Sequence, residues 1–523
     1  MNIVLIHPFI KVREVDTYLS EPLGLLCLAS YIEETFKQDV NISILDLYAL
    51  GARNPKKDGD FYCLGIDDES TISIELNKLA PDLIGITCNF TAYAKDTLEV
   101  AQLIKRNFPA VPIVIGGAHP SIEGAAMLRQ SPAIDYVVKG EGEITFANLI
   151  RHLRGEMAKE AVNGLAYRVD GKVVFNPPQE LLDDLDVLPI PDRKYIDVEA
   201  YKYFNKETVW YVRNEPVATI MTSRGCPYDC VFCSTKVVWE RNWRPRSLEL
   251  VFREIEILVE RYKIREIVIN DDQFMTQKKR VMAFCDYFIE KRYDLSFTVD
   301  AGISPWLVNK EMLKKMRQAG FYSLRFPIES GCEKTLKYVK KPVKLDKTRE
   351  LITEANRLGF WTSSNIIIGF PYETREDALE SIAYVYDSAL DFTSFLIAKP
   401  NAGSDMYDDF KKNGFLEIKV VRGSDFYRSD YDTMYLSAKD LNDLINSASG
   451  KWFMHKAWFY ANPLNFYRNL LPKIRSYRDF RYFIKVFGTL FKRKVIPILR
   501  QQLNTRLPAV ALWPRRVVKG QIP

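Results

Sequence analysis

The sequence predicts an α/β protein with two parallel-sheet domains and a helical carboxy-terminal region. Over residues 1–155, five short apolar runs alternate with amphipathic segments, which is typical of a doubly wound, Rossmann-like sheet. Over residues 206–420, six further β/α units indicate a parallel (β/α)6 partial TIM barrel. Residues 421–523 lose this alternation and become helical and aromatic. A chain of 523 residues is long enough for two or three cores.

The first domain is predicted from its strands and from the glycines that follow them. The expected strands are NIVLI, VNISILDL, DLIGITC, VPIVIGG and AIDYVVKG. Gly116 and Gly117 follow the fourth strand and Gly140 follows the fifth, so a large ligand can approach the backbone at this edge. Neither a G-x-G-x-x-G fingerprint nor a G-x-x-x-x-G-K-[ST] loop occurs, which argues against a dinucleotide or a nucleoside triphosphate.

Residues 156–205 are predicted to form a hairpin and linker between the two domains. GLAYRVDGKVVFNP is typical of a β-hairpin with Asp170 and Gly171 at its turn, and LLDDLDVLPIPDR of an extended connector. Beyond it, VATIMTS is expected to be the first barrel strand, and the loop TSRGCPYDCVFCST follows directly. This loop should therefore lie at the face where barrel active sites form.

Three of the eight cysteines, Cys226, Cys230 and Cys233, occupy this loop, and the other five are expected in the core. In a reducing compartment, such a cluster is more typical of metal binding or catalysis than of disulfides. Thiolates bind zinc or iron. A zinc site would need a fourth ligand from a distant residue, whereas an iron–sulfur cluster held by three thiolates would leave one iron open to a ligand. The absence of a fourth local ligand favours the cluster.

The C-x-x-x-C-x-x-C spacing, with Phe232 before the last cysteine, resembles the radical S-adenosylmethionine (SAM) enzymes. The resemblance implies that Cys226, Cys230 and Cys233 hold a [4Fe-4S] cluster, and that SAM binds its open iron and is cleaved to a 5′-deoxyadenosyl radical. It also implies further SAM contacts at the ends of later strands, from Asn270, Asp271, Asp272, Glu329, Ser330, Asn365 and Gly369. After LSFTVDA, where relatives often carry an arginine, this chain has Asp300 and Ala301.

The first domain resembles the cobalamin-binding domain that is fused to many radical SAM proteins, as in the class B methyltransferase-like family. The resemblance rests on EPLGLLCLASYIE, DLIGIT, GGAHPSIEG and DYVVKGEGEIT. It implies cobalamin contacts from Pro22, Leu23, Gly24, Thr87, Gly116, Gly117, His119, Gly140 and Glu141. The D-x-H-x-x-G signature is absent, so base-off cobalamin without a histidine from that motif is expected. The alternatives are that His119 is a loop histidine bonded to backbone, and that the domain has lost its cofactor.

Together, these resemblances imply a cobalamin-dependent radical SAM methyltransferase that alkylates an unactivated carbon of a small-molecule or lipid-like substrate. A flavodoxin- or ferredoxin-type protein would donate the electrons. Two alternatives stay open. One is a cyclase, oxidase or rearrangement enzyme that uses the same cofactors without methyl transfer, and the other is a zinc-stabilised, cobalamin-sensing membrane adaptor. The sequence identifies no catalytic side chain of its own.

The carboxy-terminal region is strongly basic, because fourteen Lys and Arg stand against one acidic residue from Leu464 onward. An amphipathic helix is predicted, with an apolar stripe of Phe480, Phe483, Ile484, Phe487, Leu490 and Phe491 beside Arg481, Lys485, Lys492, Arg493 and Lys494. Such a helix either packs on the barrel or lies on an anionic membrane. Nucleic acid is not expected, since no binding module accompanies the charge. Because no signal peptide or membrane span is evident, the sequence predicts a cytoplasmic protein, with peripheral contact at the inner membrane face as an alternative.

Overall fold

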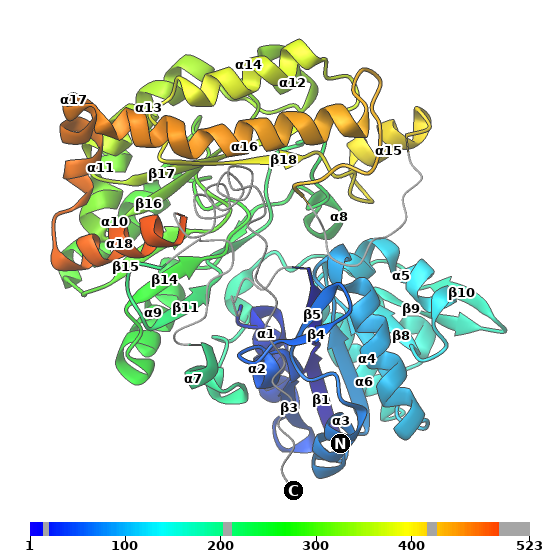
Figure 1. Ribbon diagram of the computed structural model, residues 1–523. Coiled ribbons are helices and arrows are strands. Elements are labelled where there is room, and N and C mark those ends of the chain that lie inside the picture. Colours follow the sequence, from blue (N-terminus) through cyan, green and yellow to red (C-terminus); the bar gives the residue numbers. More distant parts are fainter. Residues whose placement is uncertain (14–19, 202–211, 416–425, 491–523) are drawn as a thin grey trace, which may run out of the picture.

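The computed structural model describes residues 1–13, 20–201, 212–415 and 426–490 (Figure 1). Two α/β bodies lie against each other, and the helices of the carboxy-terminal region lie on the second body. Each body has its own buried apolar core, since the sheet of the first separates two apolar clusters and a third, larger cluster fills the second.

The first domain is a seven-stranded sheet with the order β10-β9-β8-β7-β6-β1-β3. Its strands are β1 (Asn2–His7), β3 (Asn41–Asp46), β6 (Leu83–Thr87), β7 (Ile113–Gly116), β8 (Tyr136–Val138), β9 (Leu165–Val169) and β10 (Lys172–Phe175). Five strands are parallel and follow the flavodoxin-like order 2-1-3-4-5, so the predicted doubly wound sheet is confirmed. The helices are α1 (Leu23–Phe36), α2 (Leu47–Gly51), α3 (Glu69–Leu79), α4 (Ala94–Asn107), α5 (Ala118–Gln130) and α6 (Gly142–Leu153). A small antiparallel sheet consists of β2 (Ile10–Val12), β4 (Lys56–Asp58) and β5 (Phe61–Leu64).

The predicted hairpin forms β9 and β10, and its turn residues Asp170 and Gly171 both have positive φ angles, of 50° and 76°. A two-residue hairpin turn of this kind favours Asp-Gly because both central residues are left-handed. β9 also pairs antiparallel with β8. The hairpin therefore extends the first sheet, and only the connector after it runs to the barrel, through the short helix α7 (Val198–Tyr201).

The second domain has six parallel strands in chain order, as the (β/α)6 prediction requires. β11 (Val217–Ile220), β14 (Glu266–Ile269) and β15 (Ser296–Val299) form one half; β16 (Ser323–Glu329), β17 (Trp361–Ile368) and β18 (Phe392–Ile397) form the other. A parallel bridge between Phe297 and Phe321 joins the halves. The intervening helices are α8 (Lys236–Trp239), α9 (Leu248–Tyr262), α10 (Lys278–Lys291), α11 (Lys310–Ala319), α12 (Glu333–Tyr338), α13 (Leu345–Arg357), α14 (Arg375–Tyr386) and α15 (Asp405–Lys412).

The carboxy-terminal helices α16 (Ala438–Ala461) and α18 (Tyr477–Leu490) pack on the barrel, and the short helix α17 (Pro463–Asn465) follows α16. The buried face of α18 differs from the predicted stripe, because Tyr482 and Val486 are its most buried apolar residues. They pack with Tyr322 and Trp361 of the barrel, and this packing turns Phe480 and Ile484 outward, where they are 47% and 53% exposed. Phe483 and Phe487 are partly buried, and Phe491, Lys492, Arg493 and Lys494 lie outside the described residues. None of the described helices combines the length and the apolar character that crossing a bilayer requires.

Candidate active site

The cysteine loop begins at the carboxyl end of β11. It lies between β12 (Ser223–Arg224) and β13 (Arg244–Pro245), which precede and follow it and pair as a two-stranded antiparallel ribbon. Gly225 enters the loop with a φ of 86°, and a Cβ there would lie 2.0 Å from the carbonyl oxygen of Asn242. Only glycine fits this position.

The loop is held from two sides through Val231, which is buried. Its amide donates a 3.2 Å hydrogen bond to the carbonyl of Val339, and its carbonyl accepts a 2.9 Å bond from the amide of Met406. The neighbouring Phe232 contacts Phe370, with ring centroids 6.3 Å apart. The segments after α12 and at the start of α15 thus fix the shape of the loop independently of any ligand.

Cys226, Cys230 and Cys233 are free thiols and partly exposed. Burial raises the pKa of Cys226 and of Cys230 to about 11, and the neighbouring cysteines act in the same direction. Thiolates that disfavour one another in this way are stabilised by metal. No three His, Cys, Asp or Glu side chains of the described residues form a group suited to one metal ion, but an iron–sulfur cluster binds each thiolate through a different iron. The donor set therefore fits a cluster.

Of the three SAM contacts predicted after β14, Asn270, Asp271 and Asp272, one lies beside the cysteine loop and the other two are bonded elsewhere in the barrel. Asp272 accepts a 3.3 Å hydrogen bond from the amide of Gly225, so it lies beside the cysteine loop, and burial raises its pKa to about 6. Asp271 is buried and accepts three bonds of 2.6 Å, from the amide and hydroxyl of Thr222 and the hydroxyl of Ser223. Asp271 thus holds the end of β11 in place. The backbone amide of Asn270 donates to the carbonyl of Ile220.

The side chains of Glu329 and Ser330, at the end of β16, also turn to different partners. Glu329 forms a 2.7 Å ion pair with Lys341, whose ammonium lies 5.8 Å from the ring of Phe232. Glu329 is thereby beside the cysteine loop. The hydroxyl of Ser330 lies 2.7 Å from that of Ser381, so this side chain is turned to α14.

Asn365 and Gly369 lie on and just after β17. Along this strand Ser364 and Ile366 are buried, whereas Asn365 is partly exposed on the opposite face. Gly369 has a φ of 95°, and its amide donates a 2.6 Å hydrogen bond to the carboxylate of Glu373. Sequence reasoning missed Glu373, although GFPYET contains it; it is 2% exposed, and burial raises its pKa to about 8.

Arg325 on β16 is a second candidate that sequence reasoning missed. It lies between the buried residues Leu324 and Phe326, and its guanidinium donates a 3.0 Å hydrogen bond to the carbonyl of Asp300. A cation from the next strand thus approaches the position where relatives often carry an arginine. The apolar alternation of SLRFPIE could have indicated it.

The residues predicted to bind cobalamin lie mainly at the carboxyl ends of β6, β7 and β8 and before α1. Thr87 ends β6, Gly116 ends β7, and Pro22, Leu23 and Gly24 lie at the start of α1. A Cβ on Gly24 or Gly140 would meet no atom within 4 Å, so the chain leaves open space there. In this strand order, ligands bind at the reversal between β1 and β6. The open glycines at this edge fit a large planar cofactor.

Gly117 and His119 are constrained by the chain itself. A Cβ on Gly117, whose φ is 119°, would lie 2.7 Å from the carbonyl oxygen of Cys88. The Nδ1 atom of His119 lies 3.1 Å from the hydroxyl of Thr91, so this ring nitrogen is paired with a side chain. Burial lowers the pKa of His119 to about 4, which makes the imidazole neutral near pH 7.

Glu141 points to the barrel. Its carboxylate forms ion pairs of 2.8 Å with Arg224 and 2.9 Å with Arg244, and all three side chains are buried. Arg224 is two positions before Cys226. The ligand edge of the first sheet therefore meets the start of the cysteine loop directly.

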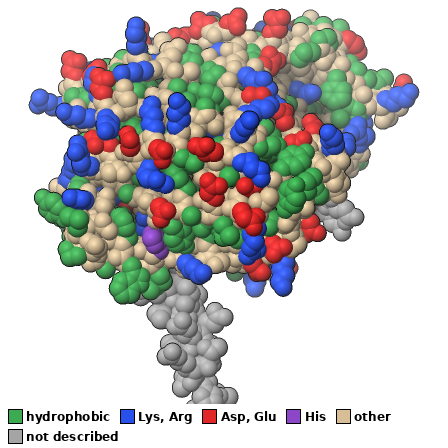
Figure 2. All heavy atoms as spheres, turned by 90° about the horizontal axis from the view of Figure 1, so that it is seen from above, with side chains coloured by type: hydrophobic (Ala, Val, Ile, Leu, Met, Phe, Trp, Pro, Cys, Tyr) green, Lys and Arg blue, Asp and Glu red, His purple; other side chains and the backbone are tan. Residues whose placement is uncertain are grey.

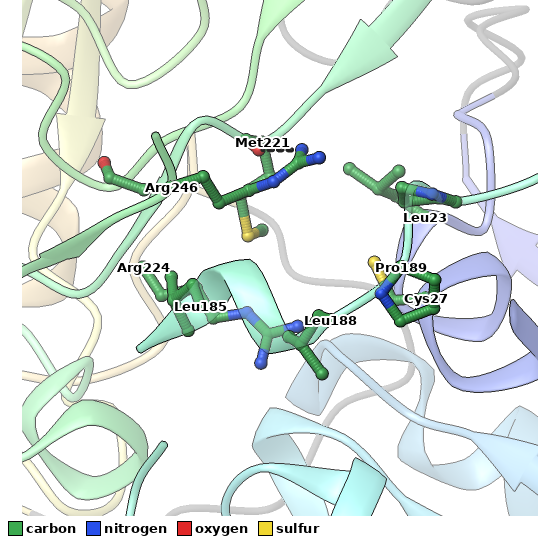
Figure 3. Close-up of a pocket in the computed structure, with 10 residues that line it drawn as sticks. Leu23, Cys27, Leu185, Leu188, Pro189, Met221, Arg224 and Arg246 are labelled. Atoms are coloured by element: carbon green, nitrogen blue, oxygen red, sulfur yellow. Dashed lines mark hydrogen bonds between the residues drawn. The ribbon is translucent and has the colours of Figure 1, made fainter. Parts of the chain in front are cut away.

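A small pocket lies where the first domain, the connector and the barrel meet (Figure 3). Its lining is mostly apolar and comprises Leu23, Cys27, Leu185, Leu188, Pro189, Pro191, Met221, Ser223, Arg224 and Arg246. Leu23 and Cys27 come from α1, while Met221 and Arg246 lie across the pocket and are hydrogen-bonded to each other. One residue predicted to bind cobalamin, Leu23, thus lines the same pocket as Met221, Ser223 and Arg224, which lead to the cysteines.

Comparisons with known proteins agree with this arrangement. The radical SAM superfamily model matches residues 220–385, and the B12 binding domain model matches residues 12–150. An uncharacterised methyltransferase of Pyrococcus horikoshii is 31% identical over 418 residues, which cover 80% of this chain and 84% of that protein. The cytidylyl-2-hydroxyethylphosphonate methyltransferase of Streptomyces wedmorensis is 30% identical, covering 81% and 83%. The anaerobic magnesium-protoporphyrin IX monomethyl ester cyclase of Rubrivivax gelatinosus is 27% identical, covering 75% and 69%.

Among solved structures, the cobalamin-dependent SAM radical enzyme OxsB with aqua-cobalamin and SAM bound has a TM-score of 0.66. The match covers 96% of this chain and 75% of that chain, at 19% identity. This likeness shows that the fold is shared.

Proposed function

Because the chain belongs to the radical SAM proteins that carry an amino-terminal B12-binding domain, we propose that it is a cobalamin-dependent methyltransferase that alkylates an unactivated carbon of a small-molecule or lipid-like substrate. The observation that carries the proposal is the contact between Glu141, after β8, and Arg224, after β11. It brings the carboxyl edges of both sheets together, so that two cofactors would face a common space.

When bound, SAM on the [4Fe-4S] cluster supplies a 5′-deoxyadenosyl radical, and cobalamin supplies a methyl group that a substrate radical can take. The chain's own residues bind and orient these groups. Cys226, Cys230 and Cys233 would hold the cluster, with Asp272 and Glu329 beside it. His119 stays neutral near pH 7, so it can accept or donate a hydrogen bond without adding a charge to the cobalamin edge.

The relatives favour methyl transfer over the other outcomes. The relatives of Pyrococcus horikoshii and Streptomyces wedmorensis, which are 31% and 30% identical, are both named methyltransferases, whereas the cyclase of Rubrivivax gelatinosus is 27% identical. A zinc-stabilised adaptor would need a fourth ligand beside the three cysteines, and no group of three or more His, Cys, Asp or Glu side chains of the described residues is arranged to hold one metal ion.

Anaerobic reconstitution with iron, sulfide and cobalamin tests the proposal. We expect about four irons per chain, and with SAM and a reductant we expect both S-adenosylhomocysteine and 5′-deoxyadenosine. Cys230→Ala should abolish both products, while the matched control Cys285→Ala, at a buried core thiol on α10, should retain them. Deoxyadenosine without homocysteine would instead indicate a cyclase or oxidase, and a site lost only on zinc chelation would indicate the adaptor.

The electron donor and the membrane contact belong to the same proposal. A flavodoxin- or ferredoxin-type protein would reduce the cluster. The segment from α16 to α18 exposes aromatic and aliphatic side chains, with Trp458, Tyr467 and Tyr477 exposed by 74%, 67% and 75%. Figure 2 shows such apolar side chains among the charges, including a group at the left edge, the side on which α17 lies in Figure 1.

The charge of these helices suits an anionic lipid surface. The one acidic residue after Leu464, Asp479, is buried and forms a 2.8 Å ion pair with Arg213. The exposed part of α18 therefore presents Arg481 beside Phe480 and Ile484, while Lys485 forms a 3.2 Å ion pair with Glu215. Aromatic and basic side chains together are typical of peripheral membrane helices.

A further inference from the structure

A buried group of four charged residues joins the two domains; we call Glu141, Glu143, Arg224 and Arg244 the interdomain clamp. Arg224 donates a 2.8 Å hydrogen bond to Glu141 and a 2.6 Å bond to Glu143. Arg244 binds both oxygens of Glu141, at 2.9 and 3.0 Å. The four side chains are 4–9% exposed. The two positive and two negative charges therefore neutralise each other inside the interface.

The ribbon of β12 and β13, whose strands precede and follow the cysteine loop, places two like charges opposite each other. Arg224 and Arg244 are cross-strand partners in the pairing of β12 with β13. Like charges directly opposite each other destabilise such a pair. The carboxylate of Glu141 bridges both guanidiniums, and both also lie within 6 Å of the ring of Trp239. The pairing of β12 with β13 therefore depends on a carboxylate of the first domain.

We propose that the interdomain clamp positions the cysteine loop. Docking of the first domain then sets the conformation of the chain just before Cys226. Arg224 is followed directly by Gly225, where the chain has no freedom to accommodate a side chain. On its other side Arg224 lines the pocket that also contains Leu23 (Figure 3). Arg224 and Arg244 thus link the first domain to both strands that flank the loop. The inference rests on the proposed function only for the identity of the group that the loop holds.

Hydrogen–deuterium exchange of the full chain, without cofactors, tests the clamp. In Glu141→Gln and in Glu143→Gln, amides 225–235 should exchange about tenfold faster or more, since a buried pair has lost one charge. Amides of β16–β18 should not change. Glu69→Gln is the matched control, because Glu69 pairs with Arg106 on the surface of the same domain and should leave the loop unaffected. Arg224→Lys, which keeps the charge but loses the planar fork, should give an intermediate rate.

A double-mutant cycle separates positioning from general destabilisation. If Glu143 acts on the loop through Arg224, then Glu143→Gln combined with Arg224→Gln should loosen the loop no more than Arg224→Gln alone. Additive effects, an unchanged loop in the Glu variants, or faster exchange throughout the barrel would each overturn the proposal. This exchange measurement requires neither a cluster nor methyl transfer, so its outcome is independent of the test of function.

Discussion

The carboxylate of Glu329 lies 2.7 Å from the ammonium of Lys341, and both side chains are less than a tenth exposed. Glu329 has a φ of 67°, which is uncommon for a residue with a side chain. The Lys341 ammonium also lies 5.8 Å from the ring of Phe232 and 5.9 Å from that of Trp306. The pair thus joins the end of β16 to the cysteine loop.

Replacing Lys341 by methionine should leave Glu329 charged and buried without its partner. Breaking a buried pair in this way costs about 3–5 kcal/mol, so we expect the free energy of unfolding to fall by that order and the reconstituted iron content to fall with it. Urea unfolding and iron analysis measure the two effects. Lys334→Met is the matched control, because Lys334 is 64% exposed in its pair with Asp377 and should change stability by less than about 1 kcal/mol. Equal effects of the two variants would contradict the assigned role of Lys341.

A Cβ at Gly225 should prevent the cysteine loop from forming. Gly225→Ala would place a methyl group 2.0 Å from the carbonyl oxygen of Asn242, so the backbone must move and iron incorporation should be lost. Gly171→Ala, at a φ of 76° with no atom within 4 Å, should cost only about 1–2 kcal/mol and retain the iron. Iron content per folded chain measures the difference, and normal iron content in Gly225→Ala would show that the loop can move.

Glu373 should make stability depend on pH. Burial raises its pKa from 4.5 to about 8, so the folded state binds the proton more tightly than the unfolded state. This contribution is full below pH 4.5 and is lost as the pH rises towards and beyond 8, by at most about 5 kcal/mol. In Glu373→Gln the decline between pH 5 and 9 should be smaller than in the natural chain. Thermal unfolding across this range measures it, and parallel curves for the two proteins would refute the assignment.

The fold was largely predictable because each element carries its own local signal. Alternating apolar runs indicate strands wherever they pair, and Asp170-Gly171 specifies its hairpin turn. The pairing of β9 with β8 was not predictable, because it depends on which edge the first sheet leaves open. Similarly, the buried face of α18 was set by Tyr322 and Trp361, which belong to the barrel.

In the candidate site, too, some features could be predicted from the sequence and others depend on residues distant in the chain. The spacing of the three cysteines indicates a cluster loop from sequence alone. The direction in which a polar residue turns at a strand end is set by distant partners: Asp271 turns to Thr222, and Ser330 to Ser381. The partner of Glu141 lies 83 residues away in the sequence, so its contact with Arg224 became visible only in the structure.

Exposed apolar side chains of α16 and α18 should contribute to membrane binding. Trp458, Phe480 and Ile484 are 74%, 47% and 53% exposed, and each would be buried among acyl chains and headgroups if these helices lie on a bilayer. The triple replacement by serine should therefore weaken binding to vesicles of equal parts phosphatidylglycerol and phosphatidylcholine by about tenfold or more. Binding should also weaken in high salt, because screening reduces the attraction between Arg481 and anionic headgroups. Leu50→Ser combined with Leu379→Ser removes exposed leucines elsewhere, 59% and 47% exposed, and should leave sedimentation with vesicles unchanged. If the triple variant sediments as well as the natural chain, these helices do not form a lipid-binding surface.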